Sequence, residues 1–206
     1  MNYLQFRNRF YDLGCFHVHQ IYALQADFDK SNLTRWIKGN LLVKLRNGYY
    51  SFPEYLNQAD FCYYVSNRIY RPSYISLHTA LAFYGMIPES VVQISAVSAL
   101  KKARFENKFG TFTYRQVAYE LMFGYDLKPF SHGRTLLFAQ PEKALLDLLY
   151  LYPFYNIAQE MEELRLDEDF MQQKLNRELF NEYAGQFQSK AFDKRVKLLL
   201  KIYDLY

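Results

Sequence analysis

Cysteine is scarce in this chain of 206 residues, which contains only Cys15 and Cys62. Two cysteines cannot form a framework of several disulfides, and neither stands in a CxxC or CxxH spacing that would hold structural zinc. The four histidines show no ligand pattern beyond the weak pair His17 and His19. The sequence therefore predicts a reduced protein without a metal site.

Long apolar runs are also missing. The best window, residues 144–155, is about 12 residues long and contains Asp147 and Pro153, whereas a membrane helix needs roughly 20 apolar residues. The first ten residues carry Arg7 and Arg9 among polar neighbours, unlike the apolar core of a signal peptide. We therefore expect a cytoplasmic protein with no membrane partner.

Motifs for catalysis are absent as well. The sequence contains no GxGxxG, GxxxxGK[ST], GxSxG or HExxH. Glu142 and Asp147 are five residues apart, roughly 140° around a helix, which is a poor arrangement for a general acid and base. Cys62 lies between Phe61 and Tyr63, and such an apolar setting is more typical of a cysteine that packs in a core than of a nucleophile. We expect no enzyme and no cofactor.

What the chain does have is apolar material and an uneven charge. Half of the residues are hydrophobic, and 20 Tyr and 18 Phe supply rings for a core. The formal net charge is +4, of which the first 58 residues hold +3 with seven basic and four acidic side chains. This length and charge distribution favour two domains, with a small basic one in front.

The segment 29–39 predicts a helix with two different faces. Asp29 is the expected N-cap, and Gly39 is expected to end the helix in a left-handed conformation. Leu33 and Trp36 fall on one side, with polar and cationic residues opposite. One face therefore belongs to a core and the other to solvent or a ligand.

A hairpin is predicted directly after this helix. Leu41, Val43 and Leu45 alternate with other residues, Asn47-Gly48 follows, and aromatic residues come next. Asn-Gly between strand-forming segments is a strong hairpin signal because both central positions then adopt positive φ.

Two shorter helices, expected at residues 3–11 and 20–25, complete a winged helix-turn-helix over residues 1–58. In this architecture one helix enters the DNA major groove and the hairpin reaches the neighbouring backbone. The expected groove-facing residues are Ser31, Asn32, Thr34 and Arg35. The expected phosphate and wing contacts are Lys30, Lys38, Lys44, Arg46 and Asn47. The same architecture also serves in protein binding and dimerisation, and this alternative stays open.

Residues 59–206 predict a larger α+β domain that ends in a helical bundle. Helical spacing marks residues 59–69, a helix capped by Ser76, and a helix opened by Pro141. Alternation marks strands near residues 92–96 and 109–114, a short apolar run marks another at 136–139, and residues from 157 onward predict helix throughout. A basic run is a candidate surface for a polyanion or an acidic partner, or is ordinary solvated surface; it comprises Lys101, Lys102, Arg104 and Lys108.

Three segments of this second domain resemble a known family. They are residues 74–89 (YISLHTALAFYGMIPE), 109–115 (FGTFTYR) and 139–149 (AQPEKALLDLL). In order and spacing they resemble the AbiE-type antitoxins of bacterial abortive infection, the regulatory partners in type IV toxin-antitoxin systems.

The resemblance implies two functions. The winged helix would bind and repress double-stranded promoter DNA through the residues of the 29–38 helix and the wing around Arg46. The C-terminal domain would counteract a nucleotidyltransferase-like toxin, without requiring a stable complex. The alternative is a solitary winged-helix regulator with a protein- or ligand-sensing domain and no toxin.

Overall fold

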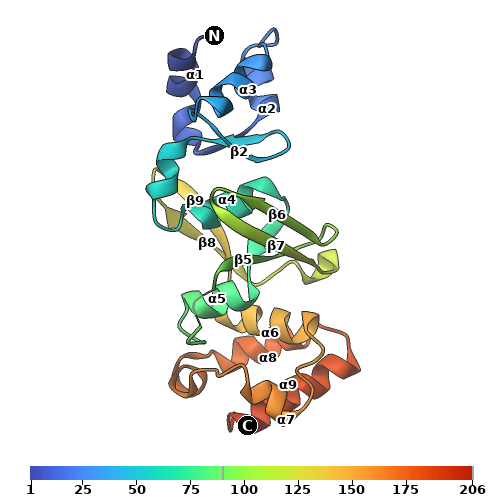
Figure 1. The fold of residues 1–206 in the computed structure, drawn as a ribbon. Coiled ribbons are helices and arrows are strands. Elements are labelled where there is room, and N and C mark those ends of the chain that lie inside the picture. Colours follow the sequence, from blue (N-terminus) through green and yellow to red (C-terminus); the bar gives the residue numbers. More distant parts are fainter. Residues whose placement is uncertain (90, 206) are drawn as a thin grey trace.

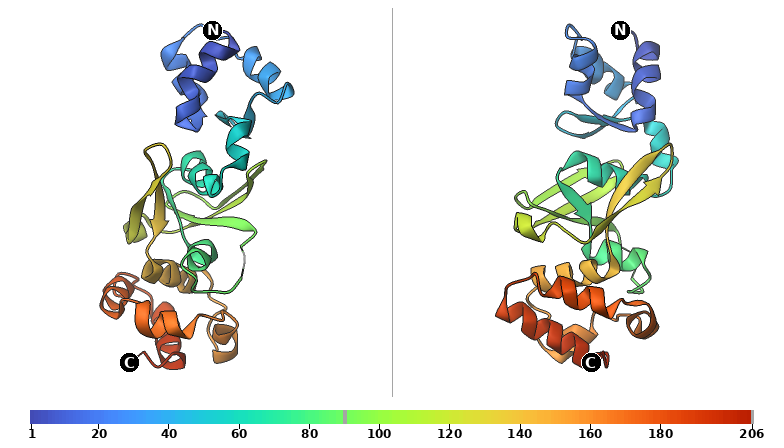
Figure 2. Two further views of the ribbon diagram at one scale, coloured as in Figure 1. Left: turned by 90° about the vertical axis from the view of Figure 1, so that its left-hand side faces the viewer. Right: turned by 180° about the vertical axis from the view of Figure 1, so that it is seen from behind.

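The computed structural model describes residues 1–89 and 91–205. Figure 1 shows an elongated molecule in which three parts follow one another: a small N-terminal part, a central sheet with short helices, and a C-terminal group of helices. The two chain ends lie at opposite ends of the molecule, as the further views in Figure 2 also show. The predicted mixture of helices and sheets is confirmed.

The N-terminal part contains three helices and a three-stranded antiparallel sheet in the order β1-β3-β2. Helix α2 begins at Val18, two residues before its predicted start, because the ring of His17 accepts a hydrogen bond from the backbone of His19 (3.3 Å). The elements are α1 (Tyr3–Phe10), β1 (Cys15–His17), α2 (Val18–Leu24), α3 (Ser31–Lys38), β2 (Val43–Arg46) and β3 (Tyr49–Ser51).

Aromatic rings fill the core of this part. Phe6 is fully buried, with its ring centroid 4.8 Å from that of Phe10 and 4.6 Å from that of Trp36. Phe16 from β1 and Phe28 from the loop before α3 also pack on the ring of Phe6. Ring pairs at these distances add to the burial energy and fix how the helices sit on the sheet.

The central part is built on a six-stranded sheet in the order β6-β7-β5-β4-β9-β8. The β5–β7 and β4–β9 pairs are parallel, and the other pairs are antiparallel. The strands are β4 (Ser73–Ile75), β5 (Gln93–Ser98), β6 (Ala103–Asn107), β7 (Gly110–Gln116), β8 (Tyr125–Phe130) and β9 (Arg134–Ala139); the helices are α4 (Phe61–Ile69) and α5 (Leu77–Phe83), and short 3-10 turns span Tyr11–Leu13, Pro53–Asn57 and Tyr119–Leu121.

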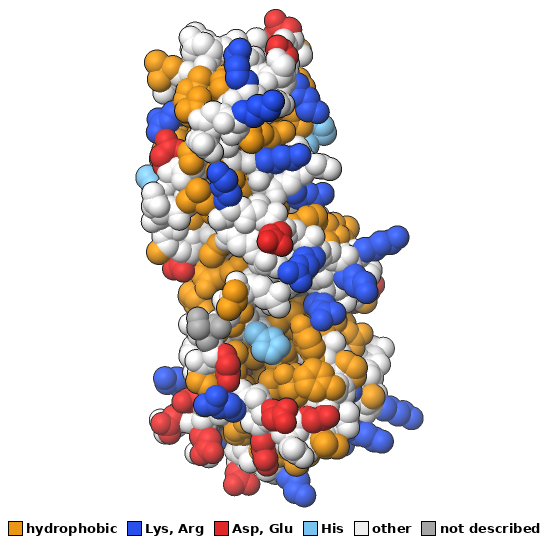
Figure 3. Space-filling model, viewed as in Figure 1, with side chains coloured by type: hydrophobic (Ala, Val, Ile, Leu, Met, Phe, Trp, Pro, Cys, Tyr) orange, Lys and Arg blue, Asp and Glu red, His pale blue; other side chains and the backbone are white. Residues whose placement is uncertain are grey.

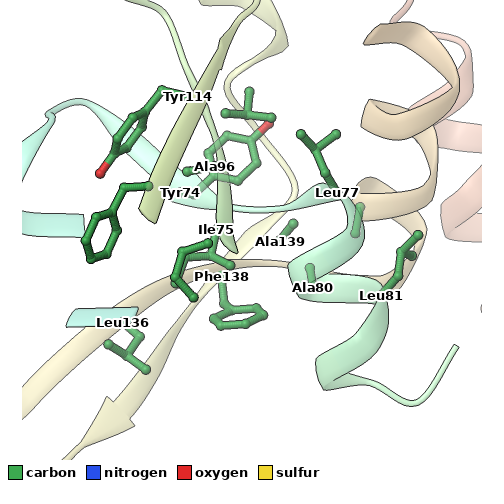
Figure 4. Close-up of a cluster of buried hydrophobic side chains, with 14 of the residues drawn as sticks. Tyr74, Ile75, Leu77, Ala80, Leu81, Ala96, Tyr114, Leu136, Phe138 and Ala139 are labelled. Atoms are coloured by element: carbon green, nitrogen blue, oxygen red, sulfur yellow. The ribbon is translucent and has the colours of Figure 1, made fainter. Parts of the chain in front are cut away.

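The central core lies where α5 packs against this sheet (Figure 4). Ile75 of β4 pairs with Phe138 of β9 and with Ala96 of β5, which brings the middle strands together. Leu77 and Leu81 of α5 are buried against them. Because β4 is buried at all three positions, its sequence carries no alternating pattern.

The C-terminal helices are α6 (Pro141–Leu151), α7 (Ala158–Glu162), α8 (Arg177–Ala184) and α9 (Lys190–Ile202), with a π-helical turn at Phe170–Lys174. The prediction of continuous helix from residue 157 is wrong at residues 163–167, 175–176 and 185–189. New helices start where side chains cap them: Asn176 accepts from the backbone of Leu179 (3.1 Å), and Ser189 accepts from that of Phe192 (3.4 Å).

A buried charged network joins α6 to the sheet. Lys143 and Asp147, one turn apart on α6, form an ion pair with no exposed side-chain area. Asp147 also accepts hydrogen bonds from the hydroxyls of Tyr74 (2.9 Å) and Ser76 (2.8 Å). Ser76 precedes α5, as predicted, but its hydroxyl binds Asp147 and does not cap the helix.

Because the thiol of Cys15 is buried, the free energy of unfolding should decrease as the pH rises through the alkaline range. Burial raises its pKa to about 12, against an ordinary value of 9.0. Between these values the unfolded chain loses a proton that the folded chain keeps, so stability falls as pH rises. Between pH 8 and pH 10, urea titrations should show the native protein losing about 1.4 kcal/mol more than a Cys15→Ala variant. Equal losses would contradict the assignment.

Candidate nucleic-acid interface

Helix α3 starts and ends differently from the prediction. Its N-cap position is Lys30, and the carboxylate of Asp29 accepts from the backbone N–H (2.8 Å) and the hydroxyl (2.6 Å) of Ser31. These two bonds hold the pKa of Asp29 below its ordinary value. At the other end, Gly39 has φ −82° and the left-handed residue is Asn40, with φ 55°.

The predicted two faces of α3 are present. Leu33 and Trp36 are buried, and the Trp36 ring contacts those of Phe6 (4.6 Å) and Tyr3 (5.5 Å). The side chain of Asn32 is half-buried and accepts from the guanidinium of Arg35 (2.5 Å). The exposed predicted residues of this segment are Lys30, Ser31, Thr34, Arg35 and Lys38. The packing of Trp36 thus presents a polar, cationic face to solvent.

The predicted hairpin is present as β2–β3, with a bulge between Lys44 and Arg46. Only Gly48 of the two turn residues has positive φ (80°), so the expectation for Asn47 is wrong. Lys44 and Asn47 are exposed. A Cβ at Gly48 would lie 2.5 Å from the ring of His17, so glycine is required here by both conformation and space.

The structure contradicts the predicted role of Arg46 as a wing residue that contacts DNA. Its Nη1 donates to the carbonyl of Ile69 (2.7 Å), and its guanidinium lies 4.5 Å from the centroid of the Phe105 ring. The ring centroids of Tyr49 and Tyr70 each lie 5.6 Å from the same guanidinium group. This side chain is therefore held in the junction between the hairpin and the central part, and it is not available for a phosphate.

Further bonds fix the hairpin to the central part. Asn107, at the end of β6, donates from its side chain to the carbonyl of Leu45 (3.1 Å). Lys108, in the following turn, lies 3.4 Å from the side-chain oxygen of Asn40. The hairpin and strand β6 therefore form one continuous surface.

The predicted basic run is divided by this arrangement. Lys108 lies beside the N-terminal part, whereas Lys101 and Lys102 precede the opposite end of β6. Lys102 and Arg104 line a hollow of the central sheet. The four residues therefore do not form one patch, because β6 is extended and spaces its two ends apart.

Charge is distributed unevenly along the molecule. Residues 1–140 contain sixteen basic and nine acidic side chains, a net charge of +7, whereas residues 141–206 contain nine basic and twelve acidic ones, a net charge of −3. Figure 3 shows Lys and Arg side chains over the upper and middle parts of one face and a concentration of Asp and Glu over the C-terminal helices. The net positive charge therefore lies in the N-terminal and central parts, and the net negative charge lies in the C-terminal helices.

Several residues around the central hollow are not among the predicted site residues, and three of them are His78, Arg115 and Tyr152. They come from α5, β7 and the end of α6, and no local motif links them. Within residues 1–89 and 91–205, no three His, Cys, Asp or Glu side chains are grouped so as to hold a metal ion. None of the helices in the described part of the chain is long and apolar enough to cross a membrane.

Comparison with known proteins adds no family assignment. No protein-family model matches the chain, and no curated protein matches it.

Proposed function

We propose that the N-terminal part is a winged helix-turn-helix that binds double-stranded DNA, with α3 in the major groove. The observation that carries this proposal is the exposed polar face of α3, held outward by the burial of Leu33 and Trp36. The order of elements and the β1-β3-β2 sheet support it. A helix of this width enters the major groove, and the adjacent hairpin lies near the backbone.

The proposed contacts differ from the sequence prediction at one position. Arg46 is removed from the set because it binds Ile69 and Phe105. The remaining candidates are Lys30, Ser31, Asn32, Thr34, Arg35, Lys38, Lys44 and Asn47. Lys108, which adjoins Asn40, is added as a backbone contact.

The biological role that we propose is that of a cytoplasmic, non-enzymatic antitoxin that represses its own promoter. The support for this role is the resemblance of residues 74–89, 109–115 and 139–149 to AbiE-type antitoxins. The net negative C-terminal helices face away from the proposed DNA end, which leaves them accessible for counteracting a nucleotidyltransferase-like toxin.

DNA binding is tested by mobility shift on the segment upstream of the chain's own reading frame. The native protein should bind with a steep salt dependence. Arg35→Ala/Lys38→Ala should lower affinity at least about tenfold, because a groove contact and a phosphate contact are lost, and it should reduce the slope of log K against log salt by about 0.9, because Lys38 neutralises one phosphate. Lys190→Ala/Lys201→Ala removes two exposed cations from α9 and should change neither quantity. Equal losses in the two double variants would contradict the α3 assignment.

The antitoxin role is tested separately in cells that express a nucleotidyltransferase encoded next to this chain. The full-length Arg35→Ala/Lys38→Ala variant should still rescue growth while it fails to repress the promoter. Loss of rescue in this variant, at normal abundance, would contradict the division of labour. Absence of any rescue by the native chain would favour a solitary regulator.

A further inference from the structure

The central sheet carries a hollow that the proposed function does not use. Two adjoining cavities of about 310 Å³ and 610 Å³ lie over β5, β6 and β7. They share Gln93, Arg104, Arg115 and Tyr152, so they form one continuous depression, which we call the β6–β7 hollow. The larger cavity is within the size range of small-ligand sites in proteins, about 300–1,000 Å³.

Three cations converge on the β6–β7 hollow. Lys102, Arg104 and Arg115 line it and are exposed, and none of them forms an ion pair with a residue among 1–89 and 91–205. No carboxylate belongs to its lining in the same described residues. Like charges that share a concave site repel one another, and a bound anion relieves this repulsion.

An aromatic and polar side completes the hollow. The guanidinium of Arg115 lies 5.0 Å from the centroid of the Tyr152 ring, and the His78 ring meets the same ring edge-on at 5.6 Å. Burial lowers the pKa of His78, which favours a neutral imidazole that can both donate and accept. Val92, which is 94% exposed, adds an apolar contact at the rim.

Figure 3 shows the same chemistry from outside: Lys and Arg side chains and a His side chain border a largely apolar area in the middle of this face. An inorganic anion alone would use the cations and leave the aromatic and apolar side without a partner. Duplex DNA is convex and would bridge a depression of this kind. A ligand with a phosphate chain at one end and a planar ring at the other uses both sides.

We propose that the β6–β7 hollow binds a nucleoside polyphosphate. The phosphates contact Lys102, Arg104 and Arg115, and the base packs against Tyr152 with Gln93 and His78 as hydrogen-bonding partners. This proposal is independent of DNA binding, because its residues lie outside α3 and the β2–β3 hairpin.

The test is isothermal titration of the full-length chain with ATP, inorganic tripolyphosphate and adenosine. ATP should bind saturably at one site, tripolyphosphate should bind at least about tenfold more weakly, and adenosine should bind more weakly still. Equal affinity for ATP and tripolyphosphate would overturn the assignment of a nucleotide. No saturable binding of ATP would overturn the site itself.

Variants place the ligand in the hollow. Arg104→Ala and Arg115→Ala should each weaken ATP about tenfold, as expected for loss of one charge-assisted contact. Tyr152→Leu should weaken ATP and leave tripolyphosphate unchanged. Lys101→Ala removes a neighbouring exposed cation that does not line the hollow, and it should have no effect.

Unchanged thermal midpoints in the absence of ligand show that each variant is folded. If Lys101→Ala weakens ATP as much as Arg104→Ala does, the binding is diffuse electrostatic attraction and the proposal fails. Competition by a 16-bp duplex that displaces ATP through Arg104 and Arg115 would reassign these residues to DNA and also overturn it.

Discussion

Substitution of Lys143 by Met should lower the free energy of unfolding by about 3–5 kcal/mol. The ammonium group is fully buried, paired with Asp147, and lies 4.7 Å and 4.9 Å from the ring centroids of Phe123 and Phe187. Burial lowers the pKa of Lys143, and Asp147 opposes this shift. Met has a similar length and keeps the packing of the stem, so the loss arises because the Asp147 carboxylate is left buried and unpaired.

A second substitution isolates this cause. In Lys143→Met/Asp147→Asn the buried charge is gone, while the amide oxygen still accepts from Tyr74 and Ser76. Urea titrations should therefore find the double variant more stable than Lys143→Met by about 2 kcal/mol. A double variant that is less stable than the single one would show that shape, and not charge, decides the stability of this network.

The junction between the N-terminal and central parts should be nearly as sensitive. Arg134, the first residue of β9, donates from Nη2 to the carbonyl of Asp12 (2.9 Å) and to the hydroxyl of Tyr55 (2.7 Å). Its guanidinium also lies 4.9 Å from the centroid of the Tyr55 ring and 5.6 Å from that of Phe61. Arg134→Ala removes these contacts and leaves a void, with an expected cost of about 3 kcal/mol in the free energy of unfolding.

Arg134 affects the free energy of unfolding in two opposing ways. Nε and Nη1 of Arg134 are buried without a hydrogen-bond partner among the described residues, and this lowers the net gain from the guanidinium. Arg165→Ala is the control: its ion pair with Glu89 is largely exposed, so its removal should change stability by less than about 0.5 kcal/mol. If urea titrations give Arg134→Ala the same small change, the two unpaired nitrogens cancel the contribution of the two bonds.

The elements that could be predicted from the sequence are those whose signals are local. Helix α3, the β2–β3 hairpin and α6 each carry their own start, stop and periodicity within about a dozen residues. Their ends moved by a residue or two, as at Asp29 and Gly39, because a side-chain bond or a single left-handed residue decides the exact boundary.

The elements that could not be predicted depend on distant partners. Strand β8 lies at an edge, is mostly exposed and contains Pro129, so it shows neither alternation nor a buried run. Strands β5 and β7 pair in parallel although β6 lies between them in the sequence, so no single turn signals this pairing. Sequence could place these segments as strands or loops, but not in a six-stranded sheet.

In the candidate site, too, features with a local sequence signal could be predicted, and features that depend on distant residues could not. The exposed face of α3 was predicted because helical periodicity alone assigns its sides. Arg46 was misassigned because an arginine near a hairpin turn looks exposed until Phe105 and Ile69 are brought beside it. Arg115 and Tyr152 were missed because they meet only after β7 and α6 are in place.

The placement of the two termini has a practical consequence for measuring the proposed DNA binding. The C-terminus lies beyond α9, at the far end of the molecule from α3 and the hairpin (Figure 1). A fluorophore or immobilisation tag at the C-terminus therefore leaves the N-terminal end unobstructed, whereas one at Met1 sits beside it. Single-molecule tests of the proposed DNA binding are best built from the C-terminal end.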